Sequence, residues 1–150
     1  MKLTSEKKTK IIAEKLALSI REKNITLCLN GDLGSGKTTF SRYLIHALQN
    51  KKQVDEIPSP TFTLLQTYEY DLGEIHHYDF YRLDQVQDLI ELNFSESIQN
   101  NICIIEWANK FNEALPNNRI DMNFEITSES SREIKFHFLG NINKEDFLWI

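Results

Sequence analysis

The chain has 150 residues, of which 41% are hydrophobic, 11% aromatic and 26% charged, a composition typical of one globular domain. Its 17 Lys and Arg against 22 Asp and Glu leave a net charge of −5, which argues against a protein that coats nucleic acid through a basic surface. Residues 1–24 hold seven bases and three acids, whereas residues 55–106 hold eleven acids and only Arg82 as a base. Such an acidic segment repels phosphate groups unless a cation lies between them.

The cysteine content and the apolar segments indicate in which compartment the chain is expected. Two cysteines are too few for a disulfide framework, and Cys28 and Cys103 each stand in a short apolar run, so we expect buried, reduced thiols. The basic N-terminus is not followed by the apolar stretch of a secretory signal, and no apolar stretch approaches the roughly 18 residues of a membrane span. We therefore expect a single cytoplasmic domain over residues 1–150, without membrane association.

Hydrophobic periodicity predicts a helix, a strand and a second helix in the first third of the chain. Apolar residues within 12–20 follow helical spacing, and Thr4 or Ser5 can cap the helix that carries them. Residues 25–29 form a short apolar run typical of a strand buried on both faces. Helical spacing returns within 40–48, so the glycines between these two segments join a strand to a helix.

The rest of the chain predicts mostly strands, one helix and a C-terminal segment that docks on the domain. Asp84 and Gln87 are spaced like a capping box for a helix that runs through Leu92, and Asn93 can end that helix in the left-handed conformation. The expected strands cover residues 63–70, 74–81, 102–106, 120–126 and 134–138. This pattern predicts a three-layer α/β domain with a mostly parallel sheet and an antiparallel extension.

The glycine-rich segment carries the most specific motif of the sequence. Residues 31–38, Gly-Asp-Leu-Gly-Ser-Gly-Lys-Thr, match G-x-x-x-x-G-K-[ST] at every fixed position, between the expected strand and helix. In such loops backbone N–H groups and the helix N-terminus face phosphate oxygens. Lys37 would reach the β- and γ-phosphates and the Thr38 hydroxyl would ligate Mg²⁺. The sequence therefore predicts a P-loop NTPase-like domain.

A P-loop site needs an acid that holds Mg²⁺, usually at the end of an apolar strand. Glu106 ends one such strand and Asp79 ends the strand before it. One acid would bind the metal or a metal-bound water and the other would orient the attacking water, in an order that the spacing leaves open. Thr61 follows two prolines on an extended loop; it either reaches the γ-phosphate or Mg²⁺, as switch threonines do, or belongs to a plain connecting loop.

Two further patterns are weaker. His76 and His77 are adjacent and point to opposite faces of a strand, so they cannot easily chelate one metal ion, and we expect both imidazoles on the strand surface. Residues 109–112, Asn-Lys-Phe-Asn, come close to the guanine-binding N-K-x-D, but Asn112 replaces the aspartate whose carboxylate accepts two hydrogen bonds. We therefore expect ATP rather than GTP.

Four motifs occur in a fixed order along the chain. They are the phosphate loop continued by Thr39 and Phe40, then 59–64 (Ser-Pro-Thr-Phe-Thr-Leu), 77–83 (His-Tyr-Asp-Phe-Tyr-Arg-Leu) and 105–107 (Ile-Glu-Trp). Together they resemble the TsaE (YjeE-like) family of small bacterial P-loop ATPases, over roughly residues 5–140. The chain departs from the family pattern at Ser35, Asn93 and Ala108, where members usually have Ala, Gly and Pro. None of these departures alters the phosphate or metal chemistry, since Ser35 is small enough to keep the loop intact.

The resemblance implies an ATPase that acts with the TsaD and TsaB proteins in N6-threonylcarbamoyladenosine synthesis at position 37 of tRNA. ATP and Mg²⁺ would be its cofactors, slow hydrolysis would reset the TsaD–TsaB complex between turnovers, and tRNA would be reached indirectly through that complex. Phosphate binding carries over to Gly34, Ser35, Gly36, Lys37, Thr38 and Thr39. Metal ligation carries over to Thr38 and Glu106, a Walker-B-like role to Asp79 and a switch-like role to Thr61, while Thr9 and Arg132 would approach the nucleotide.

Two other functions use the same phosphate loop. A small-molecule kinase usually supplies additional lid arginines, but Arg82 is the only base within residues 55–106. A nucleotide-gated protein-binding module would bind ATP in order to change its affinity for a partner, with hydrolysis incidental.

Overall fold

The computed structural model describes residues 1–50 and 56–150, so Asp55 of the acidic segment lies outside the described residues. Its helices are α1 Glu6–Ile20, α2 Lys37–Leu48, α3 Asp88–Glu91, α4 Phe94–Asn100 and the 3-10 helices η1 Ala108–Ala114 and η2 Lys144–Phe147. Its strands are β1 Lys2–Leu3, β2 Thr26–Gly31, β3 Leu65–Tyr70, β4 Gly73–Asp79, β5 Ile102–Glu106, β6 Arg119–Ile126 and β7 Arg132–Leu139. Among the described residues, no helix has both the length and the apolar character needed to cross a bilayer.

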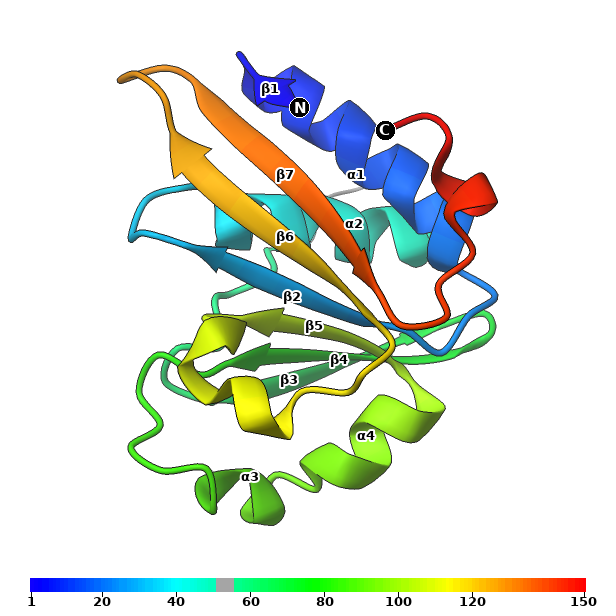
Figure 1. Cartoon of the computed structure of the whole chain (residues 1–150), viewed down its shortest axis with the longest axis vertical. Helices are drawn as coiled ribbons and strands as arrows, with labels where there is room; N and C mark the ends of the chain where they lie inside the picture. Colours follow the sequence, from blue (N-terminus) through cyan, green and yellow to red (C-terminus); the bar gives the residue numbers. More distant parts are fainter. Residues whose placement is uncertain (51–55) are drawn as a thin grey trace.

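The strands form one sheet in the order β1-β7-β6-β2-β5-β4-β3 (Figure 1). Strands β6, β2, β5 and β4 are parallel, whereas β7 and β1 add antiparallel pairs at one edge and β3 adds one at the other. Helices α1 and α2 cover one face, and α3, α4 and η1 lie against the other. The expected three-layer α/β architecture is confirmed, with antiparallel strands on both sides of the parallel centre.

The central strands are apolar because both of their faces are buried. In β2, Leu27 and Leu29 face the cluster under α1 and α2, while Cys28 faces the cluster under α4. In β5, Ile104 and Cys103 divide between the two clusters in the same way. Both thiols are free and buried, as expected, and burial raises the pKa of Cys103 to about 11.

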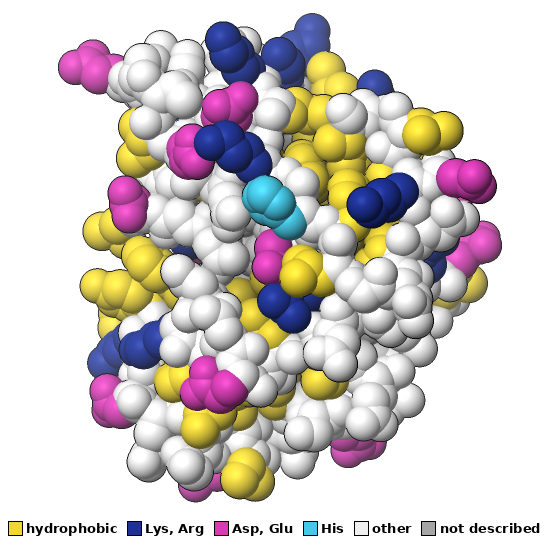
Figure 2. All heavy atoms as spheres, in the orientation of Figure 1, with side chains coloured by type: hydrophobic (Ala, Val, Ile, Leu, Met, Phe, Trp, Pro, Cys, Tyr) yellow, Lys and Arg dark blue, Asp and Glu magenta, His cyan; other side chains and the backbone are white. Residues whose placement is uncertain are grey.

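The two long helices and the C-terminal segment enclose one face of the sheet. The Ser5 side chain caps α1 by accepting a hydrogen bond from the N–H of Lys8. The C-terminal segment docks through Phe147, which is buried, and through Trp149, whose indole N–H donates to Ser19 Oγ at 2.9 Å. Phe136 of β7 and Trp149 are partly buried in edge-to-face contact. Figure 2 shows apolar side chains gathered in the part of the molecule where β7 and the C-terminal segment lie in Figure 1.

The expected helix at Asp84 is wrong in its start and its length. Helix α3 begins only at Asp88, because the Asp88 carboxylate accepts hydrogen bonds from the N–H groups of Asp84 and Gln85 and holds them in turns before the helix. Asn93 has the expected left-handed conformation, with a φ of 51°, but it leads directly into α4. Strand β3 begins at Leu65 rather than at residue 63, because Leu64 has a φ of 66° and donates its N–H to Pro60 in a turn.

Candidate nucleotide-binding site

The parallel strands β2, β5 and β4 have their carboxyl ends side by side. Open α/β sheets bind ligands at the carboxyl ends of their strands. In the register of β4 and β5, Asp79 lies opposite Glu106, so the two expected acids are neighbours on adjacent strands. In the register of β2 and β5, Leu29 lies opposite Glu106, so the phosphate loop that follows β2 begins beside the same carboxylate.

The phosphate loop leaves β2 through a glycine that packs against the neighbouring strand. A Cβ at Gly31 would lie 2.4 Å from the main-chain oxygen of Phe124 in β6, so the close approach of loop and strand requires glycine there. Gly36 precedes α2 with a φ of 102°, a left-handed conformation that ends the loop and points the first turn of the helix into the site.

Lys37, the first residue of α2, is 5% exposed and bends back over the loop. Its ammonium donates hydrogen bonds to the main-chain oxygens of Gly31 at 2.6 Å and Asp32 at 2.9 Å, and it lies 4.2 Å from the ring centroid of Trp107. Burial lowers the pKa of Lys37 below its usual 10.5, and the negative charge of Glu106 opposes that shift. The Lys37 ammonium is therefore desolvated and hydrogen-bonded to neutral carbonyl groups. An anionic phosphate is a stronger partner for the ammonium and can replace these carbonyl groups.

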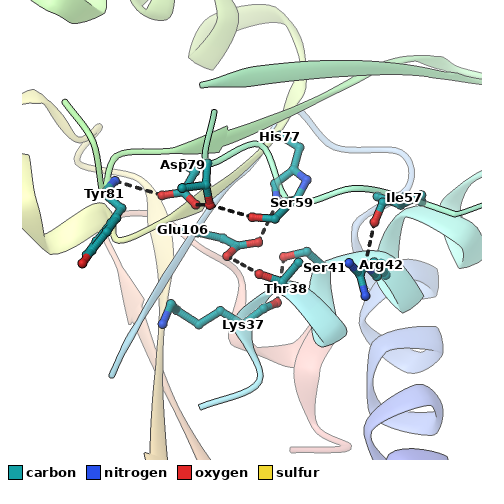
Figure 3. Close-up of polar contacts among 11 residues, drawn as sticks. Lys37, Thr38, Ser41, Arg42, Ile57, Ser59, His77, Asp79, Tyr81 and Glu106 are labelled. Carbon is teal, nitrogen blue, oxygen red and sulfur yellow. Dashed lines mark hydrogen bonds and ion pairs between the residues drawn. The ribbon is translucent and has the colours of Figure 1, made fainter. Parts of the chain in front are cut away.

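Glu106 links the phosphate loop to the sheet (Figure 3). Its Oε2 accepts a hydrogen bond from the Thr38 hydroxyl at 2.7 Å, and its Oε1 lies 2.8 Å from Nε2 of His77. His77 is fully buried, so the expectation of a surface imidazole is wrong for this residue. The spacing of His77 and Asp79 indicated that they share one face of a strand, but it did not indicate which side chain of the next strand they meet. His76 lies on the opposite face and contacts Glu74 and Ser97.

Asp79 is held by the loop that follows the two prolines. Its Oδ2 accepts a hydrogen bond from the Thr61 hydroxyl at 2.7 Å, and its Oδ1 accepts one from the N–H of Tyr81 at 2.9 Å. The Thr61 hydroxyl also lies 2.8 Å from the hydroxyl of Ser59. The structure thus places Thr61 at the acids, whereas its sequence was equally compatible with a connecting loop.

Two cavities flank the phosphate loop, and together their walls contain every site residue expected from the sequence. One, of about 240 Å³, is lined by Gly34, Gly36, Lys37, Thr38, Thr39, Thr61, Asp79 and Glu106, together with Trp107. The other, of about 320 Å³, is lined by Thr9, Gly34, Ser35, Gly36, Thr39 and Arg132. Arg132 crosses from β7 to the loop, where its Nε and Nη2 donate to the Gly34 oxygen, each at 3.3 Å.

The donors at this site suit magnesium together with phosphate. They are hard oxygens, namely the Thr38 hydroxyl and the carboxylates of Glu106 and Asp79. Within residues 1–50 and 56–150, no group of three or more His, Cys, Asp or Glu side chains could hold a metal ion by itself. Mg²⁺ is usually bound by one or two carboxylates with substrate phosphates completing its coordination, and the residues present fit that arrangement.

Comparisons with known proteins agree on one family. The family model described as threonylcarbamoyl adenosine biosynthesis protein TsaE matches residues 3–134. The chain is 39% identical over 147 residues to the tRNA threonylcarbamoyladenosine biosynthesis protein TsaE of Rickettsia typhi, covering 98% of this chain and 96% of that protein. It is 34% identical over 134 residues to the protein of that name in Bacillus subtilis, covering 89% and 81%. The crystal structure of Bacillus subtilis YdiB superposes with a TM-score of 0.75 at 26% identity, covering 98% and 89%. The chain belongs to the TsaE family.

Proposed function

We propose that this protein is a Mg²⁺-dependent ATPase that acts in the biosynthesis of threonylcarbamoyladenosine in tRNA. Membership of the TsaE family supports the biosynthetic role, since relatives that align over most of the chain carry that description. The observation that carries the ATPase assignment is the hydrogen bond from Thr38 to Glu106, which joins a P-loop hydroxyl to an acid at the end of a neighbouring strand.

Four polar residues of the smaller cavity would each have a part in ATP hydrolysis. Lys37 would leave the carbonyls of its own loop and bind the β- and γ-phosphates. Thr38 and Glu106 would hold Mg²⁺, which when bound neutralises developing charge on the phosphates. Asp79 is held by Thr61 and by a backbone N–H, and its carboxylate would orient the attacking water or a water on the metal.

The larger cavity would hold the nucleoside part of ATP. It shares Gly34, Gly36 and Thr39 with the smaller cavity, so a triphosphate on the loop can extend from one into the other. Thr9 supplies a hydroxyl to its wall, and the guanidinium of Arg132 supplies a planar cation beside the loop.

The partners in this proposal are the TsaD and TsaB proteins, with tRNA reached through their complex in the cytoplasm. Leu33, which lines the smaller cavity, is 78% exposed, and Phe62, next to Thr61, is 83% exposed. Apolar side chains exposed beside a nucleotide site are available to a partner surface, whose fit would change with the nucleotide. The net charge of −5 also favours contact with protein over a broad grip on tRNA.

The proposal is tested by co-purification with TsaD and TsaB under ATP, ADP and no nucleotide, with ATP hydrolysis measured on the same samples. Nucleotide-dependent association together with hydrolysis stimulated by the partners is expected, and both should be lost in Lys37→Met. Association under ATP without stimulated hydrolysis would instead identify a nucleotide-gated binding module. A phosphorylated small molecule in a screen of ATP with metabolites would identify a kinase.

A further inference from the structure

We propose that His77 is a positioning residue that fixes the carboxylate of Glu106 for metal binding, a role that rests on the proposed Mg²⁺-dependent function. His77 is 0% exposed and Glu106 is 2% exposed, so both side chains are removed from water. His77 stands two residues before Asp79 on β4, beside β5, which ends at Glu106.

The two oxygens of the Glu106 carboxylate have different partners, and this sets its orientation. Oε1 lies 2.8 Å from Nε2 of His77, on the sheet side, and Oε2 lies 2.7 Å from the Thr38 hydroxyl, on the side of the cavity (Figure 3). A carboxylate held at one oxygen can still rotate, whereas one held at both cannot without breaking a hydrogen bond. His77 therefore keeps Oε2 directed at Thr38, the residue with which Glu106 would share Mg²⁺.

The polar atoms of His77 show which way the hydrogen bond runs. An ionised carboxylate only accepts hydrogen bonds, so Nε2 of His77 carries the hydrogen and donates it to Glu106. The other ring nitrogen, Nδ1, is buried and has no hydrogen-bond partner among the described residues. A buried polar atom without a partner destabilises the fold, a cost that an apolar side chain at this position would avoid. An imidazole here is therefore explained by the donor that it supplies to Glu106 rather than by packing.

Loss of this donor should act on the metal and leave the metal-free nucleotide contacts alone. Without Nε2–H, Oε1 of Glu106 faces a buried region with no donor, and the carboxylate gains by rotating away from its position or by admitting water. The Thr38 hydroxyl and Glu106 then no longer present two aligned oxygens. Among the described residues, His77 makes no hydrogen bond to Lys37 or to the backbone of the phosphate loop, so we expect their geometry to stay unchanged.

The experiment compares His77→Leu with His77→Gln in the full-length chain. Leucine fills a similar volume without a donor, whereas the glutamine amide carries N–H groups at a reach comparable with Nε2. Mn²⁺ binding is measured by electron paramagnetic resonance in the presence of ADP, and mant-ADP binding is measured separately in EDTA. We expect His77→Leu to raise the Mn²⁺ dissociation constant about 10–100-fold, the range usual for loss of a partner of a metal ligand. We expect His77→Gln to recover most of the affinity, with mant-ADP binding in EDTA unchanged in both.

The neighbouring histidine supplies a matched control. His76→Gln alters an imidazole on the same strand that faces Glu74 and Ser97, and it should leave Mn²⁺ affinity unchanged. If His77→Leu does not fold, as judged by circular dichroism, His77→Asn replaces it, since its amide is too short to reach Glu106. Wild-type Mn²⁺ affinity in the variant without the donor, glutamine as weak as that variant, or a parallel loss of mant-ADP binding in EDTA would each overturn the role of His77. A wild-type chain that binds nucleotide without any metal dependence would overturn the proposed function itself.

Discussion

Replacement of Lys37 by methionine tests the phosphate site most directly. Methionine keeps an unbranched stem beside Trp107 and removes the ammonium with its charge. In the structure, that ammonium donates hydrogen bonds to the main-chain oxygens of Gly31 at 2.6 Å and Asp32 at 2.9 Å. The variant therefore loses hydrogen bonds both before and after nucleotide binding, and only the difference between them appears in the affinity.

The magnitude follows from that difference. A hydrogen bond to a charged group contributes about 1.5–3 kcal/mol, and Lys37 would make two such bonds to the β- and γ-phosphates. Binding also breaks the two bonds from the ammonium to the neutral carbonyls of Gly31 and Asp32, which offsets part of the gain. A net loss equivalent to one charged hydrogen bond, about 1.5–3 kcal/mol, raises the dissociation constant roughly 10–150-fold.

The assay is fluorescence titration of mant-ATP in the presence of Mg²⁺, with thermal unfolding measured on the same samples. Lys110→Met is the matched control, because Lys110 is an exposed lysine near the site whose ammonium donates to the Tyr81 oxygen and lines neither cavity. The control should bind mant-ATP like the wild type. Affinity within about twofold of the wild type in a folded Lys37→Met protein, well below the loss expected for one charged hydrogen bond, would refute the assignment of Lys37 to phosphate.

Three further predictions follow from the same geometry. Glu106→Ala should bind mant-ADP in EDTA like the wild type but lose Mg²⁺-dependent hydrolysis; normal hydrolysis would transfer the metal role to Asp79. Because burial lowers the pKa of Lys37, its ammonium loses its proton below pH 10.5. Nucleotide affinity, measured by mant-ATP titration across pH, should therefore fall as the pH rises through that lowered pKa. Folding stability has the opposite sign: the unfolded chain binds more protons between the lowered pKa and 10.5, so the Lys37 contribution to stability rises with pH there, and Lys37→Met should remove both trends. Gly31→Ala should lower the free energy of unfolding by more than about 2 kcal/mol in urea titrations, because its Cβ would meet the Phe124 oxygen at 2.4 Å, whereas Gly34→Ala, in open space at a φ of +76°, should cost about 1 kcal/mol.

Features that depend on local spacing could be predicted from the amino-acid sequence. Helical periodicity located α1 and α2, apolar runs located β2 and β5, and the P-loop pattern located the phosphate loop between them. These succeed because a helix face and a buried strand require their apolar residues at fixed intervals. The capping box at Asp84 failed for a related reason, since the same short polar residues can bond in turns, and Asp88 took that role instead.

Contacts between side chains far apart in the sequence depend on how the whole chain folds. Strand order and register placed β4 beside β5, and this pairing brought His77 within 2.8 Å of Glu106 although 29 residues separate them. The path of the loop after the prolines brought Thr61 to Asp79, and the β6–β7 hairpin carried Arg132 over Gly34. No local interval encodes these contacts, because the alignment of strands that are not consecutive is set by packing over the whole sheet. The chemistry of the phosphate loop could therefore be read from eight consecutive residues, whereas the hydrogen bonds that orient its acids required the fold.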